Sequence, residues 1–92
     1  MNDTVNKVSG KRLMNFIGGL ESLIGQRVTL FCGVYIYTGT LVGVSEKDAM
    51  LEDAGIVYET GPFSDSKWKD MQKLPNAIYV RTSAIEMYTI LK

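Results

Sequence analysis

The spacing of hydrophobic residues changes along the chain, and each spacing predicts a different element. Between residues 11 and 24 apolar side chains recur every three or four positions, as Leu13, Phe16, Ile17, Leu20, Leu23 and Ile24. This is the stripe of an amphipathic α-helix, which we expect to follow Ser9 as N-cap and to end at Gly25. Residues 1–10 are mostly polar, and we expect a disordered N-terminal segment there.

Beyond Gly25 the pattern becomes that of β-strands. Residues 27–32 and 34–44 are rich in β-branched, aromatic and other apolar residues, and a third such stretch holds Met50, Leu51 and residues 56–58. Gly33 and residues 45–47 predict the intervening turns. We expect Gly39 and Gly43 to mark bends within the second strand, and Gly55 a bulge in the third.

Residues 60–76 differ in character, because they hold both prolines and many polar side chains. We expect a long loop there, with room for one helical turn at residues 66–72. Phe63 and Trp68 are its notable members. The favoured interpretation is that they pack the loop onto the rest of the domain, and the alternative is a stacking or partner-binding surface.

Two short strands, at residues 77–82 and 85–90, complete the pattern around the link Thr82-Ser83-Ala84. The chain has 92 residues, of which 46% are hydrophobic, so it forms one small folded domain. We predict a mainly β fold, a strongly bent, five-stranded SH3-like barrel with an N-terminal α-helix, over residues 11–92. Glycines inside strands supply the bends that such a barrel needs to close.

Composition narrows the function. Ten basic and ten acidic residues give a formal net charge of zero, which disfavours a dedicated binder of duplex DNA. There is no histidine and one cysteine, Cys32, so we expect neither a zinc site nor an internal disulfide. No apolar run is long enough for a membrane span and the N-terminus has no apolar signal core, which predicts a soluble, cytoplasmic protein.

Candidate catalytic groups are sparse. Glu52 and Asp53 are adjacent on a predicted strand and should point to opposite faces, so they do not form one acid–base pair. Cys32 has no histidine to activate it and is interpreted as a small apolar strand residue. The pair Gly18-Gly19 lacks the spacing and the lysine of a phosphate-binding loop. We therefore expect a protein that is not an enzyme and needs no cofactor.

Several short motifs, in this order and spacing, resemble the Sm and Sm-like (LSm) family, whose superfamily includes bacterial Hfq. They are Gly25-Gln26-Arg27-Val28, Tyr37-Thr38-Gly39-Thr40-Leu41, Leu51-Glu52-Asp53-Ala54 and Val80-Arg81-Thr82-Ser83-Ala84-Ile85. The resemblance implies a homo-oligomeric ring of six to eight subunits, in which the last two strands of neighbouring subunits pair. It places Ile78, Tyr79, Val80, Met87 and Tyr88 at the subunit interface. The alternative is a monomer whose own loop covers these edges.

The resemblance also implies binding of single-stranded, uridine- or adenine-rich RNA at the pore of the ring. By position, the pocket residues would be Glu46, Asp48, Arg81 and Ser83. Asp48 replaces the family's asparagine, Glu46 offers no aromatic face for stacking, and Thr82 stands where glycine is usual. An alternative function is a ring that serves as a protein-interaction scaffold, with a partner bound through Phe63 and Trp68.

Overall fold

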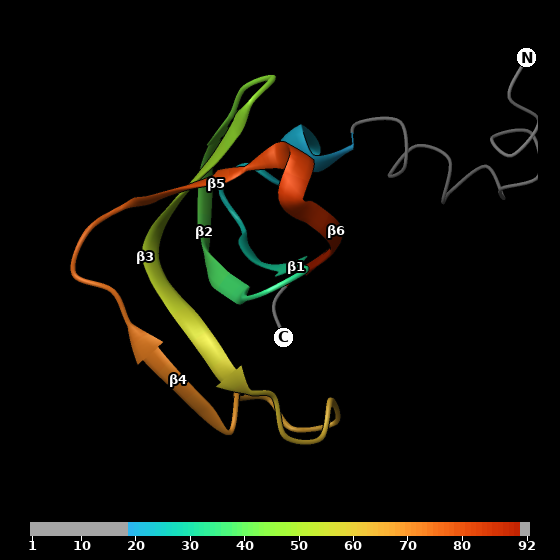
Figure 1. Cartoon of the computed structure of the whole chain (residues 1–92), viewed down its shortest axis with the longest axis vertical. Coiled ribbons are helices and arrows are strands. Elements are labelled where there is room, and N and C mark those ends of the chain that lie inside the picture. Colours follow the sequence, from blue (N-terminus) through green and yellow to red (C-terminus); the bar gives the residue numbers. More distant parts are fainter. Residues whose placement is uncertain (1–18, 91–92) are drawn as a thin grey trace, which may run out of the picture.

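The computed structural model describes residues 19–90, which form one strongly bent antiparallel sheet of six strands (Figure 1). Along the chain the elements are the 3-10 turn η2 (Leu20–Leu23), β1 (Arg27–Cys32), β2 (Ile36–Val44), β3 (Asp48–Glu59), β4 (Asp70–Lys73), β5 (Ile78–Arg81), the 3-10 turn η3 (Thr82–Ala84) and β6 (Ile85–Ile90). The mainly β, barrel-like fold class predicted from the sequence is confirmed.

The longest strand, β3, pairs with two different strands along one of its edges. The strand order is β4-β3-β2-β1-β6, and β5 also pairs with β3. The first part of β3, from Asp48 to Leu51, pairs with β5, whereas the part from Gly55 to Glu59 pairs with β4. Within this sheet β5 and β6 each have one neighbour, so the barrel stays open between them (Figure 1).

The pairing of β2 with β3 is interrupted by a shift of register between Thr38 and Thr40. Thr38 pairs with Gly55 and Thr40 with Glu52, so the single residue Gly39 faces both Asp53 and Ala54. Asp53 has a φ of 49°, a left-handed conformation that aspartate tolerates better than most residues. The predicted bulge in this strand is therefore present, but at Asp53 and Ala54 and not at Gly55.

The hydrophobic core lies inside this curl. Its fully or almost fully buried members are Val28, Leu30, Leu41, Ala49, Leu51, Ala54 and Val80. In β1, Thr29 is also buried, and its hydroxyl donates to the Thr38 hydroxyl at 3.2 Å. Thr38 in turn donates to the Val28 carbonyl at 3.0 Å, so the polar pair has its hydrogen bonds satisfied inside the sheet.

Two predictions about the connections need correction or fall elsewhere. The region expected to be one long loop contains β4, and its chain at residues 70–73 is extended against β3, so the helical turn proposed there is wrong. Residues 20–23 form a 3-10 turn, and most of the predicted α-helix, with the N-terminal segment, lies outside the described residues. Gly25 has a φ of 97°, as expected for a glycine that ends a helical segment.

Candidate functional site

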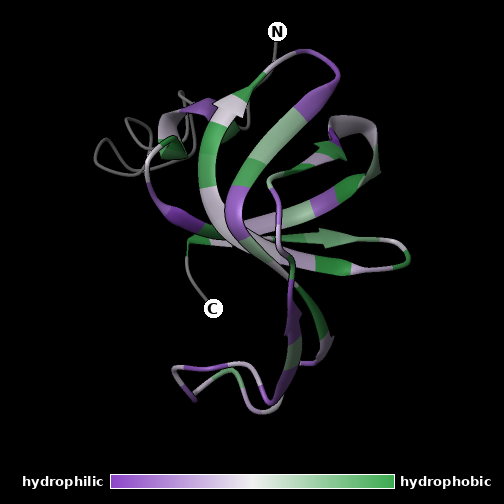
Figure 2. Ribbon diagram, turned by 90° about the vertical axis from the view of Figure 1, so that its left-hand side faces the viewer, coloured by the Kyte–Doolittle hydropathy of each residue, from purple (hydrophilic) through white to green (hydrophobic). Residues whose placement is uncertain are grey.

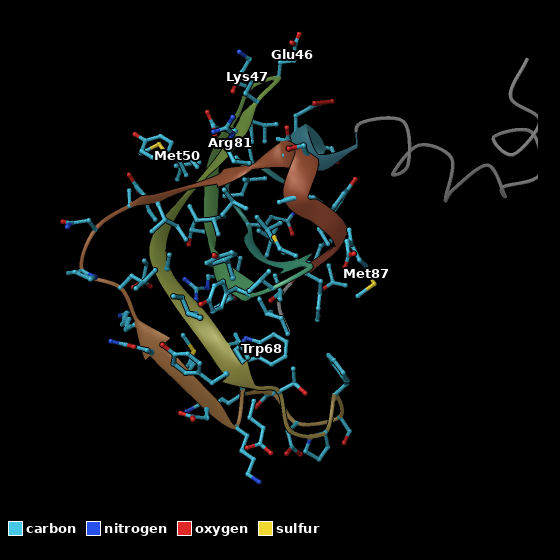
Figure 3. The ribbon with its side chains drawn as sticks, in the orientation of Figure 1. Glu46, Lys47, Met50, Trp68, Arg81 and Met87 are labelled. Atoms are coloured by element: carbon cyan, nitrogen blue, oxygen red, sulfur yellow. The ribbon has the colours of Figure 1, made fainter. Side chains whose placement is uncertain are left out.

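Two turns meet at one end of the molecule, the β2–β3 turn at residues 45–47 and η3. Figure 3 places Glu46 and Lys47 at the tip of this end, with Arg81 just below them. Thr82 joins the two turns: its backbone N–H donates to the Lys47 carbonyl at 2.8 Å, and its hydroxyl donates to the Glu46 carbonyl at 2.7 Å. A glycine at position 82 could make only the first of these bonds, so the departure from the Sm motif has a structural role here.

The charged side chains at this end are balanced. Asp48 and Arg81 are register partners on β3 and β5, with Arg81 Nε 3.9 Å from Asp48 Oδ1. The Arg81 side chain is 73% exposed, so this ion pair is weak and leaves the guanidinium accessible. Glu46 and Lys47 are exposed beside them. The structure thus gathers two acids and two bases, of which Lys47 was not selected from the sequence.

Ser83 lies in a different environment from Glu46 and Asp48. It lines a hollow of about 700 Å³ between β5, β6 and the turn from β1 to β2, together with Cys32, Gly33, Val34, Tyr35, Tyr37, Ile78, Tyr79, Val80, Arg81, Ala84 and Glu86. Most of these side chains are apolar, and they line the open side of the barrel. Arg81 alone belongs both to this hollow and to the charged end of the molecule.

The predicted interface residues divide between the two exposed strand edges and the core. Tyr79 on β5 is 65% exposed, and Met87 and Tyr88 on β6 are 50% and 39% exposed. Ile78 is half-buried, whereas Val80 is 5% exposed and belongs to the core. Val80 can therefore contribute its backbone to an edge contact but not its side chain.

The edge of β4 contrasts with those of β5 and β6. Its residues Asp70, Gln72 and Lys73 are exposed and polar (Figure 2). Charged side chains on an edge strand oppose pairing with another chain. Of the strand edges in residues 19–90, those of β5 and β6 are therefore the apolar ones.

The hollow also perturbs Cys32. Burial, and to a smaller degree the nearby Glu86 carboxylate, raise the pKa of the Cys32 thiol. A raised pKa keeps the sulfur protonated and a poor nucleophile. Within the described part of the chain no cluster of histidine, cysteine and carboxylate groups could hold a metal ion.

At the opposite end of the molecule, the turn between β3 and β4 carries two aromatic residues, Phe63 and Trp68, of which Trp68 is labelled in Figure 3. The ring of Phe63 lies 6.3 Å from that of Phe31 on β1, and 6.0 Å from that of Trp68, which it meets edge to face at 87°. The predicted packing of this loop onto the barrel is thus observed, with Phe31 as the anchor that the sequence did not single out. Phe63 nevertheless remains 62% exposed.

The described elements include no helix that is long and apolar enough to cross a membrane.

Comparison with known proteins bears on the fold. No family model and no curated protein sequence matches the chain. Among solved structures, it is similar to the SmAP1 heptamer of P. aerophilum, with a TM-score of 0.65, 16% identity and coverage of 85% of this chain and 95% of that one. It is also similar to a heptameric archaeal Sm protein, with a TM-score of 0.62, 17% identity and coverage of 79% and 96%. The chain therefore has the Sm fold.

Proposed function

We propose that this chain assembles into a closed Sm-like ring and binds single-stranded RNA at the end formed by residues 45–48 and η3. The observation that carries the proposal is the pair of apolar strand edges, β5 and β6, on either side of an open barrel. A head-to-tail contact of β5 on one subunit with β6 on the next covers both edges, and it closes when the rotation between subunits divides a full turn.

The alternation of side chains on the edge strands supports this pairing. On β5, Ile78 and Val80 face the core, while Tyr79 points to the other face beside Met50. On β6, Tyr88 is the register partner of the buried Leu30, and Met87 that of Phe31. Paired edges would therefore extend the core of one subunit into that of the next. The two archaeal structures named above are heptamers, which also supports a ring.

RNA binding is proposed at the charged end because a ring repeats this end once per subunit around its axis. Arg81 can stack on a base or contact a phosphate, and the Asp48 carboxylate can accept a hydrogen bond from a base N–H. Lys47 and Arg81 balance Glu46 and Asp48, so binding depends on local pairing and not on an overall positive field.

Assembly is tested by light scattering coupled to size exclusion. The Tyr79→Lys chain should elute as smaller species, because every repeated contact between subunits loses an apolar side chain at the edge and gains a positive charge. The matched control is Gln72→Lys on the polar edge of β4, which should leave the assembly intact. A wild-type mass of one subunit would overturn the ring.

RNA binding is tested by fluorescence anisotropy with labelled uridine and adenine oligomers at low salt. Arg81→Ala should abolish binding at this end while leaving the mass of the assembly unchanged. Asp48→Asn should strengthen binding, because it removes a negative charge and adds a donor. If the ring forms but neither oligomer binds, the RNA proposal fails.

A second candidate function is a ring scaffold that binds a protein through the loop bearing Phe63 and Trp68. The observation that favours it is the 62% exposure of Phe63, since large exposed aromatic side chains are common in interfaces. In that case the assembly would form and both oligomers would fail to bind.

A further inference from the structure

A small hollow lies on the outer face of the sheet, next to the charged end of the molecule. Its volume is about 330 Å³. Alternation along β3 identifies the face: Ala49 and Leu51 are buried in the core, so Asp48 and Met50 point to the other side. Figure 3 shows Met50 projecting away from the interior of the barrel. The residues that line the hollow are Gly43, Val44, Ser45, Asp48, Met50 and Tyr79.

A glycine leaves room for a ligand in this hollow. Gly43 is the register partner of Met50, and Met50 is that of Tyr79, so two larger side chains stand on β3 and β5 beside a position that has none. A Cβ at Gly43 would find no heavy atom within 4 Å beyond its chain neighbours. The volume is at the lower end of the range of ligand sites, which suits a single planar base.

The polar side of the hollow is Asp48, which its own turn holds in place. The Asp48 N–H donates to Ser45 Oγ at 3.1 Å, and the Ser45 N–H donates to the Asp48 carbonyl at 2.8 Å. The Asp48 carboxylate lies beside Arg81, but the 3.9 Å between Oδ1 and Nε is too long for a hydrogen bond. Both side chains are partly exposed. The pair therefore presents a carboxylate and a guanidinium group next to each other to a ligand.

A carboxylate beside a guanidinium group matches the Watson–Crick edge of guanine. That edge presents an oxygen acceptor followed by two adjacent N–H donors. Arg81 can donate to the oxygen, and the two Asp48 oxygens can accept from the two N–H groups, because an ionised carboxylate only accepts. Uracil has one N–H between two carbonyls, so one of its carbonyl oxygens would face a carboxylate oxygen. Adenine and cytosine each place a ring nitrogen acceptor beside their one amino group.

We propose that this hollow makes the RNA site selective for guanine. Asp48 accepts hydrogen bonds from N1–H and the amino group of the base, Arg81 donates to its O6, and the ring lies against Met50 over the space left by Gly43. The inference rests on the proposed RNA binding at the charged end and names the base that this end prefers. The aspartate that replaces the asparagine of the Sm family thus changes the preferred base and does not remove the site.

Base selectivity is measured with labelled uridine oligomers that differ at one central residue, which is uridine, adenosine, guanosine or inosine. Each oligomer is titrated into the full chain at low salt, and binding is followed by fluorescence anisotropy. The oligomer with guanosine should bind roughly 5- to 150-fold more tightly than the one with uridine alone, as expected for one bidentate contact to a base. Inosine keeps N1–H but lacks the amino group, so it should lose most of this advantage.

The Asp48→Asn variant should lose the preference for guanosine, because the amide replaces one acceptor with a donor. The matched control is Glu46→Gln, which removes the same charge from a neighbouring residue outside the lining of the hollow and should keep the preference. Gly43→Val should fill the hollow without a clash and weaken binding of the guanosine oligomer. Light scattering checks that each variant keeps the mass of the wild-type assembly. Tyr79 is left unchanged because it also belongs to the proposed subunit edge.

The possible outcomes separate this inference from the proposed function. Equal affinities of the wild type for all four oligomers, with binding that is lost in Arg81→Ala, would overturn guanine selectivity and leave RNA binding standing. A preference for guanosine that persists in Asp48→Asn would also overturn the inference, because another group would then recognise the base. Absence of binding to every oligomer would overturn both proposals.

Discussion

Replacing Gly39 by alanine should destabilise the domain through a steric clash between β2 and β3, at the shift of register between Thr38 and Thr40. An alanine Cβ at this position would lie 3.0 Å from the Glu52 carbonyl oxygen, 3.1 Å from the Leu51 Cβ and 3.2 Å from the Ala54 Cα. All three are tighter than ordinary van der Waals contacts. They belong to backbone or to a Cβ, so no side-chain rotation relieves them.

The expected loss of stability is that of overpacking at a position whose neighbours are backbone atoms and a Cβ, which cannot move aside. Forcing an extra methyl group into a closely packed position costs about 1–3 kcal/mol. For a domain of this size, each kcal/mol lowers the melting temperature by roughly 4–8 °C, so we expect a decrease of about 4–24 °C. A clash shared by three neighbours favours the upper half of this range.

Gly43→Ala is the matched control on the same strand. Nothing lies within 4 Å of a Cβ at Gly43, so this change should lack the steric penalty. Both variants restrict the unfolded chain equally, a stabilising effect of about 0.4–1 kcal/mol that cancels in the comparison. Thermal unfolding by circular dichroism at one protein concentration measures the difference, since assembly would make melting depend on concentration. Equal melting temperatures for the two variants would refute the close approach at Gly39.

Three further expectations concern the ion pairs, the thiol and the turn contact. The hydrogen bond from Lys73 and the charge of that residue lower the pKa of Asp53. The ionised carboxylate therefore stabilises the fold above its ordinary pKa of about 4, and this stabilisation is lost as the pH falls. The wild-type melting temperature should exceed that of Asp53→Asn at pH 7, and the two melting temperatures should converge in acid. Burial, and to a smaller degree Glu86, raise the pKa of Cys32, so the folded chain should react with iodoacetamide more slowly than the unfolded chain. The Glu86→Gln variant should react faster than the wild type. Equal rates for these two folded proteins would contradict the contribution of Glu86. Thr82→Val should lower the free energy of unfolding by about 0.5–1.5 kcal/mol, measured by urea denaturation, because it removes the hydroxyl that donates to the Glu46 carbonyl. Thr82→Ser keeps the hydroxyl and should keep the stability, and the backbone bond to the Lys47 carbonyl should persist in both variants.

Sequence reasoning located most strands but not their partners. The bounds predicted for β1 and β6 coincide with those observed, because a run of alternating apolar residues between turn signals is a local property. The sequence gives no signal for β4, because three of its four residues are polar and its one apolar residue, Met71, shows no alternation. Its extended conformation comes from pairing with β3, which is a contact between distant parts of the chain.

The same distinction holds for the candidate sites. The motif spacing predicted that Glu46, Asp48 and Arg81 lie close together, and the structure places them at one end of the molecule. It did not indicate that Thr82 joins the two turns, since that role depends on carbonyls at residues 46 and 47. The motif spacing also did not indicate that Ser83 lines the apolar hollow. The direction of a side chain in η3 depends on how this turn is oriented between β5 and β6, which local sequence does not specify.

By itself, the sequence determined the positions of every strand except β4, the neutral charge and the order of motifs that resembles the Sm family, because these depend on the identity and spacing of residues alone. Only the tertiary structure decided where the sheet bends, which edges stay open and which aromatic rings meet. Each of those depends on contacts between residues far apart in the chain, such as Gly39 with Asp53 and Ala54, or Phe31 with Phe63. Local patterns specify which segments can be strands, and long-range packing selects how they close.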